Sequence, residues 1–411
     1  MRRLALLALF PLLGLCGQAS GSVLRGAVPD GVPHHPGPVR AHVANLPWGG
    51  GAVLHHNRTH LVFWSPAGAG LSFDPGYTDL FQTFLAAVAH DSHTTGNVYS
   101  LTGQYDDESG SALYDSTYAG AINDSDPLPA RDLACQEPPG PPLGEGPGWG
   151  ECVTDDQIQA ELTHVVAQHR LPVTLGDIYV LVTPNGLGDC DTSTLPASCA
   201  LGGADNNGYC AYHSSVGTGD LLYAVIPYNA VKDHCQSDAP RPNASTADPG
   251  LSSLSHEHNE TITDPLGSGW IDGSGNEDGD LCIDQVGHPP RALGHTRAGA
   301  YDQVIARGRY WLQSEWSNAA AGCATSAPSD WLRLGLPRTT TAGVRARFRV
   351  VGNRRVVSAH WSYGDHTAGS GFRPVHTFRR AGHYTVQVRG TDTFGNWVFA
   401  QHTVRVLRAR R

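Results

Sequence analysis

The sequence predicts an α+β domain with a mixed β-sheet, followed by a small β-sandwich. Between residues 51 and 330, strand-like and helix-like patterns follow one another in the order strand, helix, helix, strand, strand, helix. From residue 337 to residue 411, apolar and polar residues alternate and cysteine is absent. These two observations place the domains at 51–330 and 337–411.

The first half of the larger domain contains both strand and helix patterns. The stretch 52–66 predicts two strands around a turn near Asn57, because two apolar runs flank polar residues. Residues 77–92 and 155–169 carry apolar residues at helical spacing. The second of these segments opens with an acidic pair, which suits a helix N-terminus.

The second half predicts the centre of the sheet. Residues 177–186 form a continuous apolar run that ends in Pro and Asn-Gly, as expected of a strand covered on both faces. Residues 220–228 predict a shorter strand, and residues 250–264 predict the last helix. We therefore expect a mixed sheet, a backing helix and a final helix that carries the candidate site.

The N-terminal segment predicts export. Residues 1–20 combine basic residues, an apolar run of about 12 residues and small residues, the pattern of a secretory signal peptide. The run is shorter than the ~20 residues that span a bilayer, so no transmembrane segment is expected. Residues 21–50, rich in Pro, Gly and His, predict a flexible leader. The net charge of −10 and the lack of a basic tract before residue 340 exclude nucleic acid as a partner.

The cysteine content supports a secreted protein. Removal of the signal peptide takes Cys16 with it and leaves eight of the nine cysteines, an even number that predicts disulfide bonds in an exported chain. Eight cysteines allow 105 pairings, and the sequence leaves the choice open. Cys135 with Cys152 is the favoured local pair, because it would close the Gly- and Pro-rich stretch between them. The chain lacks the CxxC spacing of a cysteine metal site.

The helix at 250–264, with Asp248 as its expected cap, carries the candidate site. His256 and Glu260 are four positions apart, so their side chains leave the same face one turn apart, as two ligands of one metal ion require. Glu257 lies about 100° around the helix, where a carboxylate acts as general base on a zinc-bound water. The alternative is a solvated acidic helix face.

Two acidic residues downstream complete the candidate site. Glu277 and Asp280 follow Glu260 by 17 and 20 positions, in the range where a zinc hydrolase of the gluzincin type returns its third ligand. The segment NEDGD is similar to the Asn-Glu segment of that type. By this resemblance Glu277 binds zinc and Asp280 supports His256 from behind. Calcium is the alternative ion, because oxygen donors alternate from Asp272 to Asp280, although the loop lacks the Gly and the final Glu of an EF-hand.

The region around this helix resembles the phosphate-induced protein 1 family, also called Exordium-like proteins. The residues that carry the resemblance are His256, Glu257, Glu260, Asp264, Pro265, Trp270, Glu277, Asp280, Leu281 and Cys282, together with Cys210 and His213 in YCAYHSS. The similarity extends over residues 50–325 and implies a zincin-like fold and an extracellular protein. In zincins a strand beside the site helix binds substrate, so we expect His213 to face the cleft and to polarise a carbonyl; a structural histidine is the alternative.

The C-terminal segment resembles the polycystic-kidney-disease (PKD) domain, which implies an Ig-like β-sandwich. The matching residues are Trp361, Tyr363, Gly364, Asp365, His376, Phe378, Gly382, Tyr384 and Val386. Such domains accompany exported hydrolases and surface proteins as spacers or as weak binding modules. The expected partner is therefore an extracellular protein or a cell-surface polymer, while the sequence defines no oligomeric state.

Two functions follow from these observations. The first is a secreted zinc hydrolase, peptidase-like in its chemistry, in which His256, Glu260 and Glu277 bind the metal and Glu257 is the base. The second is a non-enzymatic extracellular or wall-associated protein of the Exordium type, in which the same residues hold a structural ion.

Overall fold

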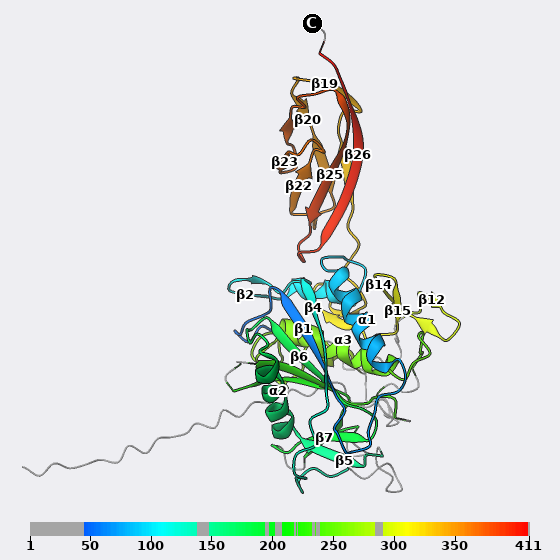
Figure 1. Ribbon diagram of the computed structural model, residues 1–411. Helices are drawn as coiled ribbons and strands as arrows, with labels where there is room; N and C mark the ends of the chain where they lie inside the picture. The colour runs from blue at the N-terminus through cyan, green and yellow to red at the C-terminus, as the bar shows by residue number, and fades with distance from the viewer. Residues whose placement is uncertain are drawn as a thin grey trace, which may run out of the picture.

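The computed structural model describes residues 45–409, except for 138–147, 194–196, 202–207, 218, 220, 232–234, 236–238 and 284–290. The predicted signal peptide and most of the predicted leader lie outside the described residues. The chain forms an N-terminal α+β domain and an elongated C-terminal β-sandwich (Figure 1). Within the described ranges, no helix combines the length and the apolar character needed to cross a bilayer.

A mixed five-stranded sheet forms the centre of the N-terminal domain, as the sequence predicts. Its strand order is β10, β11, β6, β1, β4, in which β10 is antiparallel to β11 and the other neighbours are parallel. The strands are β1 (Asn57–Trp64), β4 (Ser116–Asp124), β6 (Asp177–Val182), β10 (Tyr212–Val216) and β11 (Leu221–Ile226). The antiparallel strand β10 is thus an edge strand.

Helices cover both faces of this sheet. Successive residues of a strand point to opposite faces, so each strand contributes side chains to the packing on both sides. In β1, Leu61 and Phe63 belong to the apolar cluster that contains the buried residues of two helices, α1 and α3. Val62 and Trp64 belong to a second cluster, which contains the apolar face of α2. The bounds of the helices are Tyr77–His90 for α1, Asp155–His169 for α2 and Asp248–Thr263 for α3.

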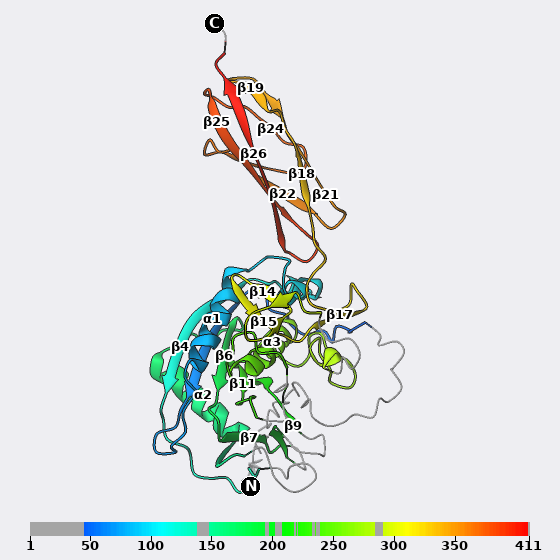
Figure 2. The same ribbon diagram turned by 90° about the vertical axis from the view of Figure 1, so that its right-hand side faces the viewer.

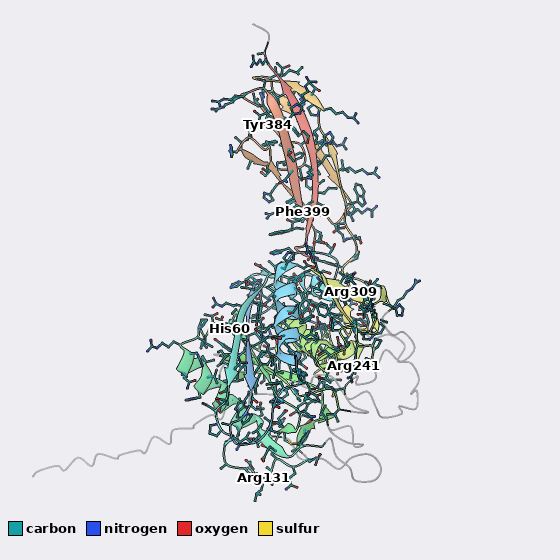
Figure 3. All side chains as sticks on the ribbon, turned by 45° about the vertical axis from the view of Figure 1, so that its right-hand side comes forward. His60, Arg131, Arg241, Arg309, Tyr384 and Phe399 are labelled. Carbon is teal, nitrogen blue, oxygen red and sulfur yellow. A yellow bond between two sulfur atoms is a disulfide. The ribbon has the colours of Figure 1, made fainter. Side chains whose placement is uncertain are left out.

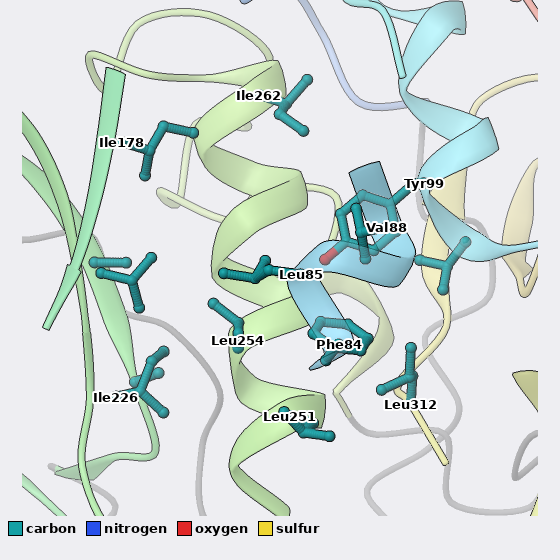
Figure 4. Packing of buried hydrophobic residues seen from close by; sticks show 14 of the residues in the cluster. Phe84, Leu85, Val88, Tyr99, Ile178, Ile226, Leu251, Leu254, Ile262 and Leu312 are labelled. Atoms are coloured by element: carbon teal, nitrogen blue, oxygen red, sulfur yellow. The ribbon is translucent and has the colours of Figure 1, made fainter. Parts of the chain in front are cut away.

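Helix α3 lies in the middle of the domain. In Figure 4, Leu251 and Leu254 of α3 lie between Ile226 of the sheet on one side and Leu85 and Val88 of α1 on the other. Every residue of α3 is buried. The structure therefore excludes a solvated acidic face on this helix.

The ends of α3 differ in detail from the expectation. Asp248 is the first helical residue and does not cap the helix; its carboxylate accepts hydrogen bonds from the backbone of Asn243 and Ser245 in the preceding turn. At the other end, Asp264 Oδ1 accepts from the backbone N–H groups of Ser268 and Gly269, both at 2.7 Å. These bonds order the loop that follows the helix.

Two predictions for the start of the domain are wrong. Residues 52–54 are not a strand, because Leu54 N donates to the carbonyl of Ile262 at the end of α3 instead of to a neighbouring strand. Residues 45–50, placed in the leader, belong to the domain. Leu46 is buried, and Trp48 forms a β-bridge with Trp270.

Small elements complete the N-terminal domain. A second sheet contains β5 (Glu151–Thr154), β7 (Leu187–Asp191), β8 (Ser198–Ala200) and β9 (Gly208–Tyr209). Short hairpins join β2 (Asp106–Asp107) to β3 (Gly110–Ser111), β12 (Gly294–His295) to β13 (Ala300–Tyr301), β14 (Gln303–Ile305) to β15 (Gly308–Tyr310), and β16 (Glu315–Ser317) to β17 (Gly322–Ala324). Two 3₁₀ helices, η1 (Val98–Gln104) and η2 (Asp280–Cys282), lie near α3 and β16.

Four disulfide bonds hold the N-terminal domain together. They join Cys135 to Cys152, Cys190 to Cys199, Cys210 to Cys235, and Cys282 to Cys323. The favoured local pair is confirmed, and the other six cysteines now have partners. The last bond matters most for the candidate site, because it fixes η2 to the β16–β17 hairpin.

The C-terminal sandwich contains the strands β18 to β26. Their bounds are Leu332–Gly335, Thr339–Thr341, Ala346–Arg347, Arg349–Gly352, Ser358–Ser362, Ala368–Ser370, Val375–His376, Gly382–Thr391 and Trp397–Leu407. Strand β18 pairs with β21, so the sandwich begins at Leu332 and not at residue 337. Its core contains Trp361, Tyr363 and Phe378, which are aromatic residues of the predicted pattern.

The two domains touch through the turn between β25 and β26 (Figure 2). The imidazole of His93 stacks on the indole of Trp397, with ring centroids 4.0 Å apart. Asn396 donates a hydrogen bond to the carbonyl of Ser100 in η1, and Phe394 packs with Leu101 of η1. In Figure 3, Phe399 lies at the end of the sandwich that faces the N-terminal domain. The contact therefore joins the sandwich to the 3₁₀ helix beside α3.

Candidate metal centre

Helix α3 places two candidate ligands side by side. His256 Nε2 lies 3.1 Å from Glu260 Oε2, one turn along the helix, and both side chains are buried. Neither atom has a hydrogen-bond partner in the part of the chain that the structure describes. Because α3 packs against the sheet and α1 through its leucines, these polar side chains leave the helix on another side, toward η2 and β16.

Asp280 approaches the same pair from η2. Its Oδ1 lies 3.7 Å from His256 Nε2, and its backbone N–H donates to Glu260 Oε1 at 3.0 Å. His256, Glu260 and Asp280 thus form a group whose ligand atoms lie within 4.8 Å of one another. Ligand atoms of a tetrahedral zinc ion, each at about 2.1 Å, are separated by about 3.4 Å, so the group fits such an ion.

The structure differs here from the predicted role of Asp280. A residue that supports a metal-bound histidine contacts the nitrogen that does not bind the metal. Asp280 instead faces Nε2, the atom that Glu260 also faces. The Nδ1 atom of His256 is contacted by Gln313, whose Nε2 lies 3.0 Å away. Gln313, not Asp280, is therefore the residue behind His256.

Gly279 allows this close packing. A Cβ atom at this position would lie 2.5 Å from His256 Nδ1 and 2.8 Å from Glu260 Oε1. Its carbonyl also accepts a hydrogen bond from Gln313 at 2.8 Å. A larger residue at position 279 would therefore require His256 and Glu260 to shift.

Glu257 and His213 form a second pair beside the first. His213 is on the edge strand β10, and its Nδ1 lies 3.1 Å from Glu257 Oε2 and 3.7 Å from Glu260 Oε2. Glu257 Oε1 has no hydrogen-bond partner and lies 3.9 Å from His256 Nε2. The structure thus brings the predicted base and the predicted polarising histidine to the two candidate ligands on α3.

Glu277 lies on the His213 side of the cluster. Its Oε1 is 3.7 Å from His213 Nε2, and both of its carboxylate oxygens are buried without a hydrogen-bond partner. It is not in the group formed by His256, Glu260 and Asp280. Asp280 is the third member of that group, and Glu277 faces the neighbouring histidine.

The cluster contains far more acidic than basic groups. Its carboxyl groups are those of Glu257, Glu260, Asp264, Glu277, Asp278, Asp280 and Glu315, and their described ion-pair partners are His213 and His256. Burial, reinforced by the neighbouring carboxylates, raises the pKa of Glu260, Glu277 and Glu315 well above the usual range. Buried charges of one sign require protons or a cation. A divalent ion fits this charge balance.

Two members of the cluster are missed by the sequence prediction, and a third, Asp278, was predicted only as a donor of the alternative calcium site. Gln313 and Glu315 come from β16 and the segment before it, 50 or more positions after the end of α3. Asp278 accepts a hydrogen bond from Thr263, and its carbonyl accepts one from Trp316 of β16. The run QSE, between Leu312 and Trp316, carries no spacing that relates it to α3, so the sequence offered no signal for these contacts.

The calcium alternative is not supported by the positions of its donors. Asp272 Oδ1 accepts hydrogen bonds from the backbone of Ser274 and Asn276, and Oδ2 accepts one from the Asn276 side chain. Asp278 and Asp280 instead belong to the buried cluster. The alternating oxygen donors therefore do not converge on one point.

His258 lies away from this cluster. Its ring contacts Thr59 Oγ1 at 2.9 Å and Tyr99 Oη at 3.3 Å. Burial lowers the pKa of His258 to about 4, which keeps the ring neutral. This agrees with its position on the apolar stripe of the helix.

Comparison with known proteins identifies the C-terminal domain. Residues 332–406 match the PKD domain family. The chain is similar to the PKD1 domain of Vibrio anguillarum Epp, with 24% identity over 20% of this chain and 98% of that chain and a TM-score of 0.18. It is also similar to the PKD1 domain of the Vibrio cholerae metalloprotease PrtV, with 22% identity over 20% and 99% and a TM-score of 0.18.

One comparison extends over both domains. OgpA from Akkermansia muciniphila aligns with 91% of this chain and 99% of its own, at 10% identity and a TM-score of 0.20. A TM-score this low says nothing about a shared fold. No curated protein matches the chain. The Exordium-like and zincin-like resemblance of the N-terminal domain therefore stays a prediction, whereas residues 332–406 are a PKD domain.

Proposed function

We propose that the protein is a secreted, metal-dependent hydrolase of the peptidase type, in which His256, Glu260 and Asp280 hold a zinc ion. The observation that carries this proposal is that ligand atoms of His256, Glu260 and Asp280 lie within 4.8 Å of one another, and that those of His256 and Glu260 are buried without a hydrogen-bond partner among the described residues. The excess of carboxylates around them supports a divalent cation. The four disulfides and the PKD domain fit an extracellular protein.

The residues beside the ligands have the positions that hydrolysis requires. Zinc, when bound, supplies a Lewis acid that lowers the pKa of a water molecule toward 7. Glu257 presents an unpartnered oxygen next to His256 and accepts the proton of the attacking water. His213, 3.1 Å from the other oxygen of Glu257, orients this carboxylate and donates a hydrogen bond to it.

The burial of the cluster favours a second candidate function. His213, His256, Glu257 and Glu260 have 0% exposed surface, so a substrate has no access to them in this conformation. In that case the ion is structural and the protein is an extracellular or wall-associated scaffold. The PKD domain then acts as its interaction module, with an extracellular protein or a surface polymer as partner.

Replacement of Glu257 by Gln separates the two functions. The variant keeps the size of the side chain and the three proposed ligands, and it removes the carboxylate that accepts a proton. For a hydrolase we expect unchanged zinc content, unchanged melting temperature and a loss of peptide hydrolysis of roughly 10²–10⁴-fold. Glu151→Gln, at an exposed position of β5, is the matched control and should keep full activity.

The test uses full-length protein, a peptide library and metal analysis of each variant. Wild-type protein that contains zinc but cleaves no peptide would support the scaffold. Hydrolysis that survives Glu257→Gln unchanged would contradict the proposed role of this carboxylate.

A further inference from the structure

A second acidic cluster lies on the opposite face of the central sheet. Asp124 is the last residue of β4, Asp126 follows it in the next loop, and Glu161 is on α2. Each offers a carboxylate oxygen, and these oxygens lie within 4.8 Å of one another. Two oxygens bound to one calcium ion at about 2.4 Å are at most about 4.8 Å apart, so the three fit one ion.

Two oxygens of this cluster are buried and accept no hydrogen bond from an N–H or hydroxyl group of the described residues, and the two carboxyl groups that carry them face each other. Asp124 is only 8% exposed; its Oδ1 accepts a hydrogen bond from the backbone of Asp126, whereas its Oδ2 has no hydrogen-bond partner. Glu161 Oε1 is likewise buried and unpartnered. A buried, unpartnered carboxylate oxygen is costly unless it meets a proton or a cation.

The surrounding groups do not neutralise the cluster. His164, on the same helix as Glu161, lies 3.2 Å from Asp126 Oδ2, and its side chain is 58% exposed. Its positive charge, when the ring is protonated, therefore offsets at most the charge of Asp126.

The backbone around the cluster is rigid. Trp64 Nε1 donates to the carbonyl of Asp126 at 2.9 Å, and Ser65 N donates to the carbonyl of Asp124 at 2.9 Å. Both donors are at or just after the end of β1, the strand that pairs with β4. These bonds hold the backbone of Asp124 and Asp126 beside the end of β1.

We propose that Asp124, Asp126 and Glu161 bind a calcium ion that fixes α2 to the end of β4. Three carboxylates and no buried nitrogen or sulfur ligand favour a hard cation, and an exported protein meets calcium at millimolar concentrations. The site is independent of the proposed hydrolase centre, which lies on the other side of the sheet.

Calcium binding by the full-length, zinc-loaded protein tests this site. We expect one calcium ion with a Kd on the order of 10⁻⁴–10⁻³ M, the range of extracellular modules, and a rise of the melting temperature with calcium. Glu161→Gln and Asp124→Asn each remove one anionic ligand and should weaken binding about tenfold or more. The side-chain oxygen of the Asp124→Asn variant can still accept the hydrogen bond from the backbone N–H of Asp126. Asp156→Asn, which removes an exposed acid from the same helix, is the matched control and should bind calcium like the wild type.

Terbium, used in place of calcium, locates the ion. Trp64 donates a hydrogen bond to Asp126, so excitation of tryptophan should give terbium emission. Added calcium should displace the terbium and remove this emission. The Glu161→Gln and Asp124→Asn variants should not show it. A wild-type protein whose melting temperature does not respond to calcium would overturn the proposal. Calcium stabilisation that both variants retain would also overturn it, because the ion would then bind elsewhere.

Discussion

The side-chain amide nitrogen of Gln313 lies 3.0 Å from Nδ1 of His256 and 2.8 Å from the carbonyl oxygen of Gly279. An amide NH₂ has two hydrogens and can donate to both. Nδ1 then acts as the acceptor in this contact. Ligation through Nε2 requires the proton on Nδ1, so Gln313 must turn its oxygen toward His256 when the metal binds.

Gln313 should therefore control metal affinity. We expect Gln313→Ala to weaken zinc binding about 10- to 100-fold, the usual effect of removing a residue behind a metal-bound histidine. Gln313→Glu, which accepts the Nδ1 proton without turning, should bind zinc at least as tightly as the wild type. Competition with a zinc-binding dye measures both affinities. Equal affinities of Gln313→Ala and the wild type would rule out this role.

Gly279 offers a steric test of the same site. We expect Gly279→Ala to lose zinc and about 1–3 kcal/mol of stability, because the methyl group overlaps His256 and Glu260 in a packed interior. Gly273→Ala is the control in the same loop, since a Cβ there meets no atom within 4 Å. Zinc content and denaturant unfolding of the two variants should differ. Similar values for both would show that the loop adapts.

Removal of the metal should lower the stability of the whole N-terminal domain. Without the ion, the cluster around Glu260 must take up protons or bury unpaired charge. A ligand that binds only the native state at 100 times its Kd contributes about 2.7 kcal/mol. Chelation should therefore lower the melting temperature, and added zinc should restore it. A melting temperature that is the same before and after complete zinc removal contradicts the site.

The disulfide bonds should differ in their contributions to stability. Chain entropy predicts that Cys282–Cys323, with a sequence separation of 41, contributes about 4 kcal/mol, whereas Cys190–Cys199, with a separation of 9, contributes about 2.5 kcal/mol. Replacement of both cysteines of each bond by serine, followed by urea unfolding, measures the difference in stability. We also expect loss of the 282–323 bond to weaken zinc binding, because Asp280 is in η2. Unchanged zinc affinity in that variant would show that η2 stays in place without it.

The contact between the domains should depend on Gly103. A Cβ at this position would overlap the carbonyl oxygen of Phe394 in the PKD domain. We expect Gly103→Ala to separate the domains while both remain folded, which small-angle scattering detects as a larger radius of gyration. Gly96→Ala, where a Cβ has free space, should leave the radius unchanged. An unchanged radius of gyration for Gly103→Ala would mean that the other contacts are sufficient to hold the two domains together.

Local patterns in the sequence predicted the elements but not the way the site is assembled. The helices at 77–90 and 155–169 and the strand at 177–182 follow from apolar periodicity, which each segment carries by itself. The pair His256 and Glu260 is equally local, because four positions make one turn. Gln313 reaches His256 from a segment 57 positions later, and no periodicity encodes such a contact. Residues 52–54 resemble a strand because their side chains are apolar, but they bury those side chains beside α3.

The Cys282–Cys323 bond also decides where a pulling force enters the N-terminal domain. Tension applied to the PKD domain travels along the chain from Leu332 toward Cys323, the last residue before the linker that is held covalently. There it divides between the β16–β17 hairpin and the sulfur bridge to Cys282, two positions after Asp280. A protein anchored through its PKD domain would thus bear load directly beside its acidic cluster, and reduction of this one bond would leave the hairpin to carry that load alone.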